Sequence, residues 1–168
     1  MATTRRSHCA WLFVVTALAV FAPGAGAQAP AHDPLFERLA GRWSGRGTVL
    51  GQATDVTLDW EWVLGDRFLR LRFTNRGLAY EGHAYYRADG DGAYTGMWFD
   101  TSGALRPIAA RRDGQALVAR WGDPGTEEGD TTYRLGPDDR LVVIDRVRQA
   151  DGTWRVFGET TLTRVGGG

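Results

Sequence analysis

The densest group of residues that could do chemistry lies between residues 70 and 86. Glu81, His83 and Tyr85 alternate along one segment, and Arg72 lies on the segment before it. A carboxylate, an imidazole and a phenol that converge with a guanidinium could transfer protons, as in an isomerase or hydrolase, or bind a polar ligand. His83 could also serve as an axial metal ligand. The alternative is a solvated outer surface, because only one face of each strand points inward.

The roles of three charged residues depend on which face of their strands points into the fold. Arg70 and Arg72 alternate with apolar residues, which favours a solvated outer face for both arginines. On an inward face they could instead bind a carboxylate. Asp145 lies on the apolar side of its own segment, and in that case it would be the natural counter-ion of a buried arginine.

Tryptophans form a second candidate group. Trp60 and Trp62 alternate along one segment, Trp98 lies on another, and Trp121 and Tyr94 add to the aromatic content. If these aromatic side chains lined the interior of a hollow β-barrel, they would suit a flat apolar or aromatic ligand. The alternative is that the rings fill a solid core. An internal cavity of ~300 Å³ or more would favour ligand binding over a filled barrel.

The composition excludes several classes of enzyme. The chain has no Lys, which excludes a phosphate-binding P-loop and Schiff-base chemistry. Its only Cys is Cys9, and its serines beyond the N-terminal segment, Ser44 and Ser102, lie in no G-x-S-x-G motif. The acidic turn Asp89–Gly92 lacks the later ligands of a calcium loop. We therefore predict no catalytic residue and no metal site.

The N-terminal segment has the pattern of a secretory signal peptide. Arg5 and Arg6 precede an apolar run over residues 11–22, and small residues follow it. The run is shorter than the ~20 residues that span a bilayer, so an uncleaved anchor is the less favoured alternative. We predict that residues 1–27 are removed, with residue 29 as the alternative cleavage position. The mature protein would be periplasmic or secreted.

Removal of that segment changes the charge and the redox chemistry of the chain. It would leave 18 of the 20 arginines against 20 acidic residues, and no cysteine. A slightly negative protein is a poor candidate for binding nucleic acid. Without a disulfide the fold must rely on its core, for which about 140 residues suffice.

The rest of the chain has the pattern of short strands joined by tight turns. One short helix is expected at 33–40, with Asp33 as its cap, Pro34 in its first position and Gly41 at its end. Beyond it, apolar and polar residues alternate with a period of two. Strands are predicted near residues 42–50, 53–63, 67–76, 78–87, 93–100, 104–111, 115–121, 130–136, 140–149 and 153–165.

This spacing predicts an all-β fold. About ten strands separated by short turns favour an antiparallel up-and-down β-barrel. No segment offers the long helix that would connect parallel strands. We predict one barrel domain over residues 33–165 and a frayed tail at 166–168.

Four short motifs follow one another along the predicted strands. The G-x-W at Gly41–Trp43 is the signature of the lipocalin superfamily (the calycins), and its extension to Gly47 resembles nitrobindin-type β-barrels. Leu64–Leu69, Tyr80–Gly82 and Tyr94–Asp100 follow it. The ordered set resembles a bacterial lipocalin-like family catalogued as domain of unknown function fifteen seventy-nine.

The resemblance implies a lipocalin-like barrel that holds a small ligand and has no established activity. Trp43 would close one end of the barrel, with Arg164 from the last strand packed across its ring. Nitrobindin-type proteins bind haem through a histidine near the end of the barrel, and residues 140–165 contain none. We therefore expect no cofactor, with haem as the subordinate alternative.

These patterns together lead to one favoured hypothesis and two alternatives. We favour an exported barrel that binds a small hydrophobic or amphipathic molecule without catalysis. The alternatives are an enzyme that uses the polar cluster and a filled barrel that serves as a structural or interaction module of the cell envelope. No nucleic-acid partner and no membrane-spanning segment in the mature chain are expected. The residues proposed to face the ligand are Trp60, Trp62, Arg72, His83, Tyr85 and Trp98.

Overall fold

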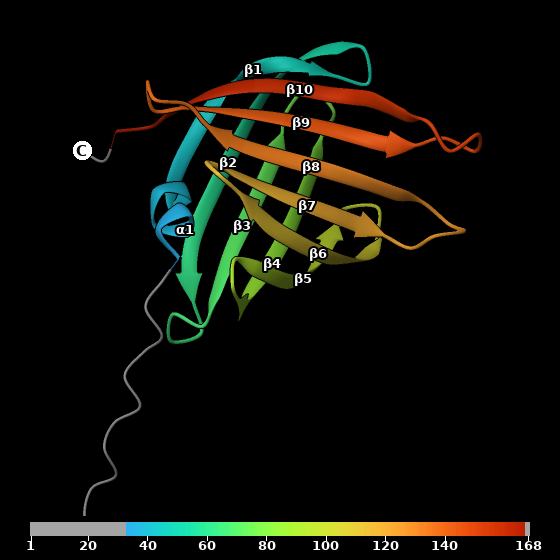
Figure 1. Cartoon of the computed structure of the whole chain (residues 1–168). Coiled ribbons are helices and arrows are strands. Elements are labelled where there is room, and N and C mark those ends of the chain that lie inside the picture. The colour runs from blue at the N-terminus through green and yellow to red at the C-terminus, as the bar shows by residue number, and fades with distance from the viewer. Residues whose placement is uncertain (1–32, 167–168) are drawn as a thin grey trace, which may run out of the picture.

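The structure, a computed structural model, describes residues 33–166 (Figure 1). The predicted signal peptide lies outside the described residues. A short helix, α1 (Pro34–Leu39), precedes ten strands. The strands are β1 (Gly41–Val49), β2 (Gln52–Val63), β3 (Phe68–Asn75), β4 (Tyr80–Gly90), β5 (Ala93–Asp100), β6 (Leu105–Asp113), β7 (Ala116–Gly122), β8 (Glu128–Leu135), β9 (Arg140–Arg148) and β10 (Trp154–Arg164).

The ten strands form one closed antiparallel barrel. Each strand pairs with its neighbours in the chain, and β1 also pairs with β10, so the sheet has no free edge. The closing register places Trp43 opposite Arg164. This confirms the predicted fold class. Within the described residues, no helix has the length and apolarity that a membrane-spanning helix needs.

Tight turns set the registers of the hairpins. The turn between β4 and β5 contains Asp91 at φ 51° and Gly92 at φ 72°, as expected for an Asp-Gly hairpin turn. The turn between β1 and β2 is less expected, because Leu50 itself adopts φ 51° before Gly51. Positive φ is rare for a branched apolar side chain. Leu50 is also 63% exposed.

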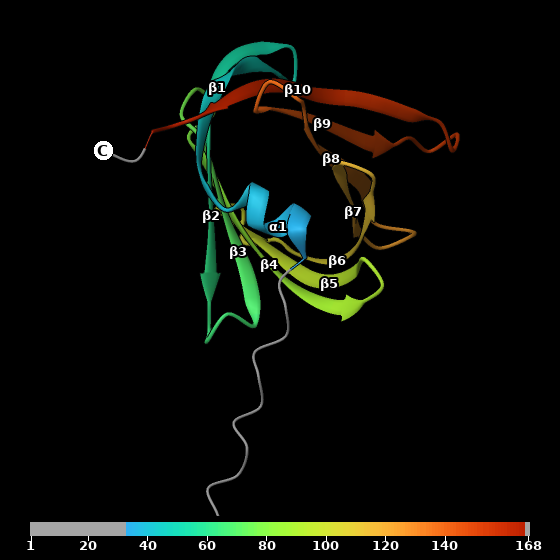
Figure 2. The same ribbon diagram turned by 60° about the vertical axis from the view of Figure 1, so that its left-hand side comes forward.

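The helix α1 fills one end of the barrel. The Asp33 carboxylate accepts a hydrogen bond from the backbone N–H of Leu35 at 2.8 Å, and Pro34 occupies the first turn. Phe36 is buried and stacks on Tyr94, with ring centroids 4.2 Å apart. Figure 2 shows α1 within the ring of strands.

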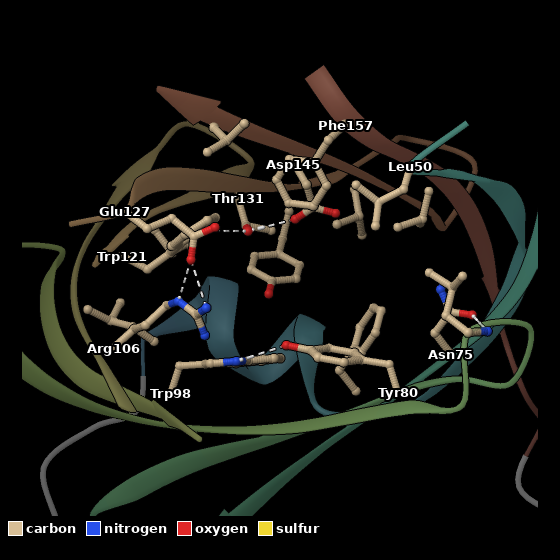
Figure 3. A pocket seen from close by; sticks show the side chains of 18 of the residues that line it. Leu50, Asn75, Tyr80, Trp98, Arg106, Trp121, Glu127, Thr131, Asp145 and Phe157 are labelled. Carbon is tan, nitrogen blue, oxygen red and sulfur yellow. Dashed lines mark hydrogen bonds and ion pairs between the residues drawn. The ribbon is translucent and has the colours of Figure 1, made fainter. Parts of the chain in front are cut away.

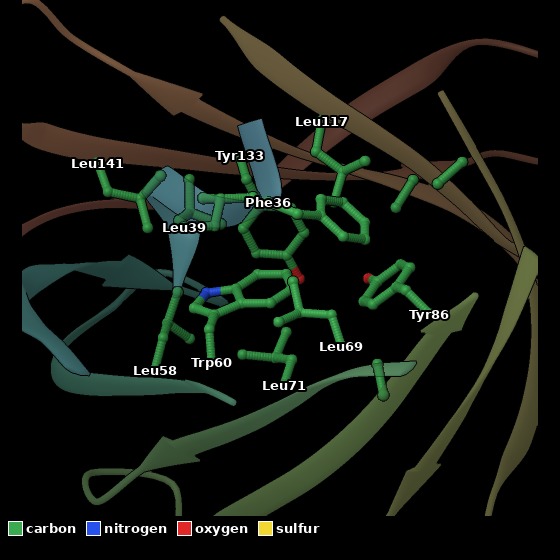
Figure 4. Close-up of a cluster of buried hydrophobic side chains, with 14 of the residues drawn as sticks. Phe36, Leu39, Leu58, Trp60, Leu69, Leu71, Tyr86, Leu117, Tyr133 and Leu141 are labelled. Atoms are coloured by element: carbon green, nitrogen blue, oxygen red, sulfur yellow. The ribbon is translucent and has the colours of Figure 1, made fainter. Parts of the chain in front are cut away.

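The apolar core occupies the half of the barrel next to α1. Inward-facing residues of neighbouring strands meet the helix there and form one buried cluster (Figure 4). The largest buried members are Phe36, Leu39, Trp43, Leu58, Trp60, Leu69, Leu71, Tyr86, Tyr94, Leu117, Tyr133, Leu141 and Leu162.

Trp43 and Arg164 join the helix to the barrel seam. Trp43 is fully buried, and its Nε1–H donates to the carbonyl of Leu39 at 2.8 Å. The Arg164 guanidinium lies over the Trp43 ring, 4.2 Å from its centroid. It also donates to the carbonyls of Arg38 and Ala40, both at 2.6 Å. The expected packing of Arg164 across Trp43 is therefore present, and Arg164 also satisfies carbonyls at the C-terminus of α1.

We predict that Arg164→Met lowers the free energy of unfolding by about 2 kcal/mol, because it removes a cation–π contact and two charge-assisted hydrogen bonds. Urea unfolding followed by tryptophan fluorescence measures the loss. Arg46→Met is the control, since Arg46 is 88% exposed and forms only a surface pair with Asp55. Equal effects of the two substitutions would contradict the role given to Arg164.

Candidate ligand-binding cavity

The half of the barrel away from α1 is hollow. A cavity of about 640 Å³ begins above the packed core and opens among the β1–β2, β3–β4, β5–β6, β7–β8 and β9–β10 connections (Figure 3). Its walls are formed by Val49, Leu50, Phe73, Asn75, Leu78, Tyr80, Tyr86, Trp98, Arg106, Ile108, Ala119, Trp121, Glu127, Thr131, Tyr133, Val143, Asp145, Val147, Gln149, Arg155 and Phe157. Apolar and aromatic side chains predominate among them.

Two indole rings lie flat against the wall because a neighbouring strand carries glycine beneath each ring. A Cβ atom added to Gly82 would lie 2.0 Å from the Trp98 ring. A Cβ atom added to Gly129 would lie 2.0 Å from the Trp121 ring. Any larger residue at either glycine would push the indole toward the lumen. The two glycines therefore preserve the width of the cavity.

One polar network centres on Asp100 at the end of β5. Its Oδ2 accepts hydrogen bonds from the Tyr80 hydroxyl at 2.9 Å and from Trp98 Nε1 at 3.1 Å. It also pairs with Arg106 Nη1 at 2.7 Å. The Nε and Nη2 of Arg106 both donate to Glu127, at 3.1 and 2.7 Å. Arg106 therefore lies between two carboxylates and directs its donors at them.

The environment of Asp100 keeps its carboxyl ionised. Burial alone would raise the pKa of Asp100, and its side chain is only 1% exposed. Hydrogen bonds from Ser102, Tyr80 and Trp98 outweigh burial and hold the pKa of Asp100 below its usual range.

A second carboxyl, Asp145 on β9, faces the cavity in a different environment. Its Oδ1 accepts a hydrogen bond from Thr131 Oγ1 at 2.7 Å. Thr131 in turn accepts from Trp121 Nε1 at 3.2 Å, which directs the hydroxyl proton of Thr131 toward Asp145. Burial raises the pKa of Asp145 to about 6, although the Thr131 bond acts in the opposite direction.

The expected counter-ion for Asp145 is not found. Among the residues that the structure describes, no arginine pairs with Asp145, and Thr131 is its hydrogen-bonding partner. Of the two arginines that line the cavity, Arg106 pairs with Asp100 and Glu127, and Arg155 forms no ion pair with Asp145 among the described residues. Asp145 was correctly placed on the inner face by the apolar pattern of its strand, but its partner was wrongly predicted.

The predicted tryptophans separate into two groups. Trp98 lines the cavity. Trp60 is 2% exposed and lies in the packed half, against Tyr86 and Tyr133 at centroid distances of 5.7 and 5.1 Å. Trp62 packs against Phe36 of α1 at 6.0 Å. Trp60 and Trp62 were proposed to face a ligand in the lumen. They lie instead in the packed half of the barrel, because α1 occupies the lumen there.

The polar cluster of Arg72, His83 and Tyr85 lies on the outer surface. Arg72 pairs with Glu81 at 3.0 Å, and His83 Nε2 lies 2.9 Å from Glu81 Oε1. The hydrogen bonds from Arg72 and then from His83 lower the pKa of Glu81 to about 2.

The proposed lumen positions of these three residues are therefore wrong. Their strands direct the alternate residues Leu71, Ala84 and Tyr86 into the core, so period-two geometry sends the polar side chains outward. Tyr85 contacts the exposed ring of Phe99 there. The acid–base cluster suggested for an enzyme does not form in the lumen.

Sequence reasoning missed most of the cavity's polar groups. Arg106, Asp100 and Glu127 lie at strand ends or in a connection, where no alternation marks an inward face. Arg106 does share its strand face with the inward-facing Ile108 and Ala110, and this parity could have indicated it.

The described residues also bear on metal and haem binding. No group of three metal-ligating side chains occurs among residues 33–166. His83, the histidine in that range, lies on the outer face of the barrel, so none of the described residues presents an imidazole to the cavity. Residues 33–166 therefore offer no histidine ligand to a haem in the lumen.

We predict that Asp145→Asn stabilises the protein at neutral pH. A carboxyl whose pKa is higher folded than unfolded makes the protein less stable as pH rises from about 4 to about 6. The variant lacks this loss, so its advantage in free energy of unfolding should grow to about 2 kcal/mol between pH 4 and pH 7. Urea unfolding at both pH values measures it.

Asp100→Asn is the contrasting variant. The pKa of Asp100 is lowered in the folded state, so its contribution is present above about pH 4 and is lost in acid. It should destabilise the protein at pH 7 by about 2 kcal/mol, and by less once the pH falls below about 3. The same sign for both variants at pH 7 would contradict the environments described.

Comparisons with known proteins do not add to this description. No protein-family model matches the chain, and no curated protein matches it. The resemblance to the lipocalin superfamily and to nitrobindin-type barrels stays a prediction based on short motifs. What the structure itself shows is a closed ten-stranded barrel with one packed half and one hollow half.

Proposed function

We propose that this protein binds a small hydrophobic or aromatic ligand in the hollow half of its barrel, without catalysing a reaction. The observation that carries the proposal is the cavity of about 640 Å³. Ligand pockets commonly have volumes of ~300–1,000 Å³, apolar walls and a few placed polar groups. A filled structural barrel would have no such space.

The character of the walls supports this choice of ligand. Trp98, Trp121 and Phe157 present aromatic surface to the lumen, and Val143 and Ile108 add aliphatic surface. An apolar molecule that enters would remove this surface from water at ~25 cal/mol for each Å² buried. The polar groups nearby would orient the ligand rather than supply most of its binding energy.

The compartment is part of the same proposal. The signal-peptide pattern of residues 1–27 supports a periplasmic or secreted protein. A barrel in that location would take up or carry a ligand outside the cytoplasm.

We predict that N-phenyl-1-naphthylamine, an uncharged aromatic probe, binds with an increase in its fluorescence. Trp121→Ala should weaken binding by about 10-fold, because it removes a large part of the aromatic wall. Titration at constant protein concentration measures the dissociation constant.

Trp154→Ala is the matched control. Trp154 packs under Arg146, whose guanidinium lies 5.3 Å from its ring centroid, and it does not line the cavity. This variant should bind the probe as the unaltered protein does. Phe157→Ala offers a second wall variant if Trp121→Ala folds poorly. Equal binding by wall and control variants, or no binding by the unaltered protein, would refute the proposal.

A further inference from the structure

We propose that the cavity selects ligands with a positively charged nitrogen, an aromatic or lipophilic amine, and that Asp145 binds that nitrogen. The inference rests on the proposed ligand-binding function and specifies the chemical class of the ligand. It depends on where the carboxyl lies, on what surrounds it and on how the other charges of the cavity are used.

Asp145 has acceptor capacity that the protein leaves unused. An ionised carboxylate can accept about four hydrogen bonds. Among the described residues Thr131 supplies one, to Oδ1, and no cation lies within ion-pair distance of either oxygen. The carboxyl is nevertheless part of the cavity wall, in contact with the space where a ligand would lie. A ligand ammonium could donate to it directly.

The fold holds this carboxyl in one position. Gly158 lies opposite Asp145 in the β9–β10 register, next to an irregularity in the pairing. A Cβ atom added to Gly158 would lie 2.7 Å from Asp145 Oδ2. Glycine at this site therefore makes room for the carboxyl, while the Trp121–Thr131 chain of hydrogen bonds fixes its other oxygen.

The remaining charges of the cavity do not favour an anionic ligand. Arg106 directs Nε, Nη1 and Nη2 at Asp100 and Glu127, and so is already neutralised. Arg155 lies at the exposed mouth, where water screens its charge. Two arginines, Arg106 and Arg155, and two carboxylates, Glu127 and Asp145, line the space. Asp100 pairs with Arg106 behind the wall and adds a third carboxylate, which leaves an excess of negative charge around the cavity.

The surroundings of Asp145 also suit a cation with an aromatic body. Trp121 and Phe157 lie edge to face in the same wall, with ring centroids 6.4 Å apart. Aromatic faces attract cations as well as apolar groups. Burial raises the pKa of Asp145 only to about 6, so the group is ionised at pH 8. A ligand cation would then offset the desolvation of this carboxylate.

The test uses three fluorescent probes that share a dansyl group and a five-carbon linker. One ends in an ammonium (dansylcadaverine), one in the N-acetylated form of that amine, and one in a carboxylate. At pH 8 and low salt we expect the ammonium probe to bind about 10-fold more tightly than the acetylated probe. The carboxylate probe should bind most weakly.

Asp145→Asn should abolish this preference. The amide oxygen can still accept from Thr131, so the wall keeps its shape while the charge is lost. The variant should bind the ammonium probe only as tightly as the acetylated probe, about 10-fold more weakly than the unaltered protein does. Undiminished binding of the acetylated probe by the variant shows that it folds.

Asp55→Asn is the matched control, because Asp55 is an exposed aspartate that pairs with Arg46 on the outer surface of the barrel. It should leave all three dissociation constants unchanged. Equal binding of the ammonium and carboxylate probes, or equal effects of the two Asp→Asn substitutions, would overturn the inference and leave ligand binding intact. Binding of none of the probes would overturn both proposals.

Discussion

A closed sheet of ten strands encloses more space than its own inward-facing side chains can fill. Eight strands leave an interior just wide enough for side chains, and the diameter grows with each added strand. In this protein the excess space is filled at one end only, where α1 enters the lumen and Phe36 and Leu39 pack among the strand residues. The Trp43–Arg164 contact secures the helix to the seam. The opposite end stays hollow.

The fold could be predicted from the sequence because its signals are local. Alternation marked each strand, and Asp-Gly pairs such as Asp91-Gly92 marked turns. Asp33 and Pro34 marked the start of the helix. Nine of the ten strand pairings join neighbours in the chain, and the β1–β10 pairing that closes the barrel is the long-range one.

The cavity was harder to predict, because it depends on which face of each strand points inward and on where the helix ends. Trp60 and Trp98 both lie on inward-facing strand positions, yet α1 fills the space beside Trp60 and not beside Trp98. His83 and Glu81 lie one residue out of phase with the inward positions. Glu127 reaches the cavity from the connection between β7 and β8, where no strand alternation predicts the direction of a side chain.

Three cavity side chains rest on glycines of neighbouring strands: Trp98 on Gly82, Trp121 on Gly129 and Asp145 on Gly158. The volume and polarity of the lumen are therefore set partly by residues that contribute no side-chain atoms to it. A single methyl group added at one of these glycines would reshape the chamber while the outer surface and the strand registers stayed as they are. Barrels with the same outer surface could in this way bind ligands of different size. Such barrels would differ only in whether one of these glycines carries a methyl group in place of a hydrogen atom.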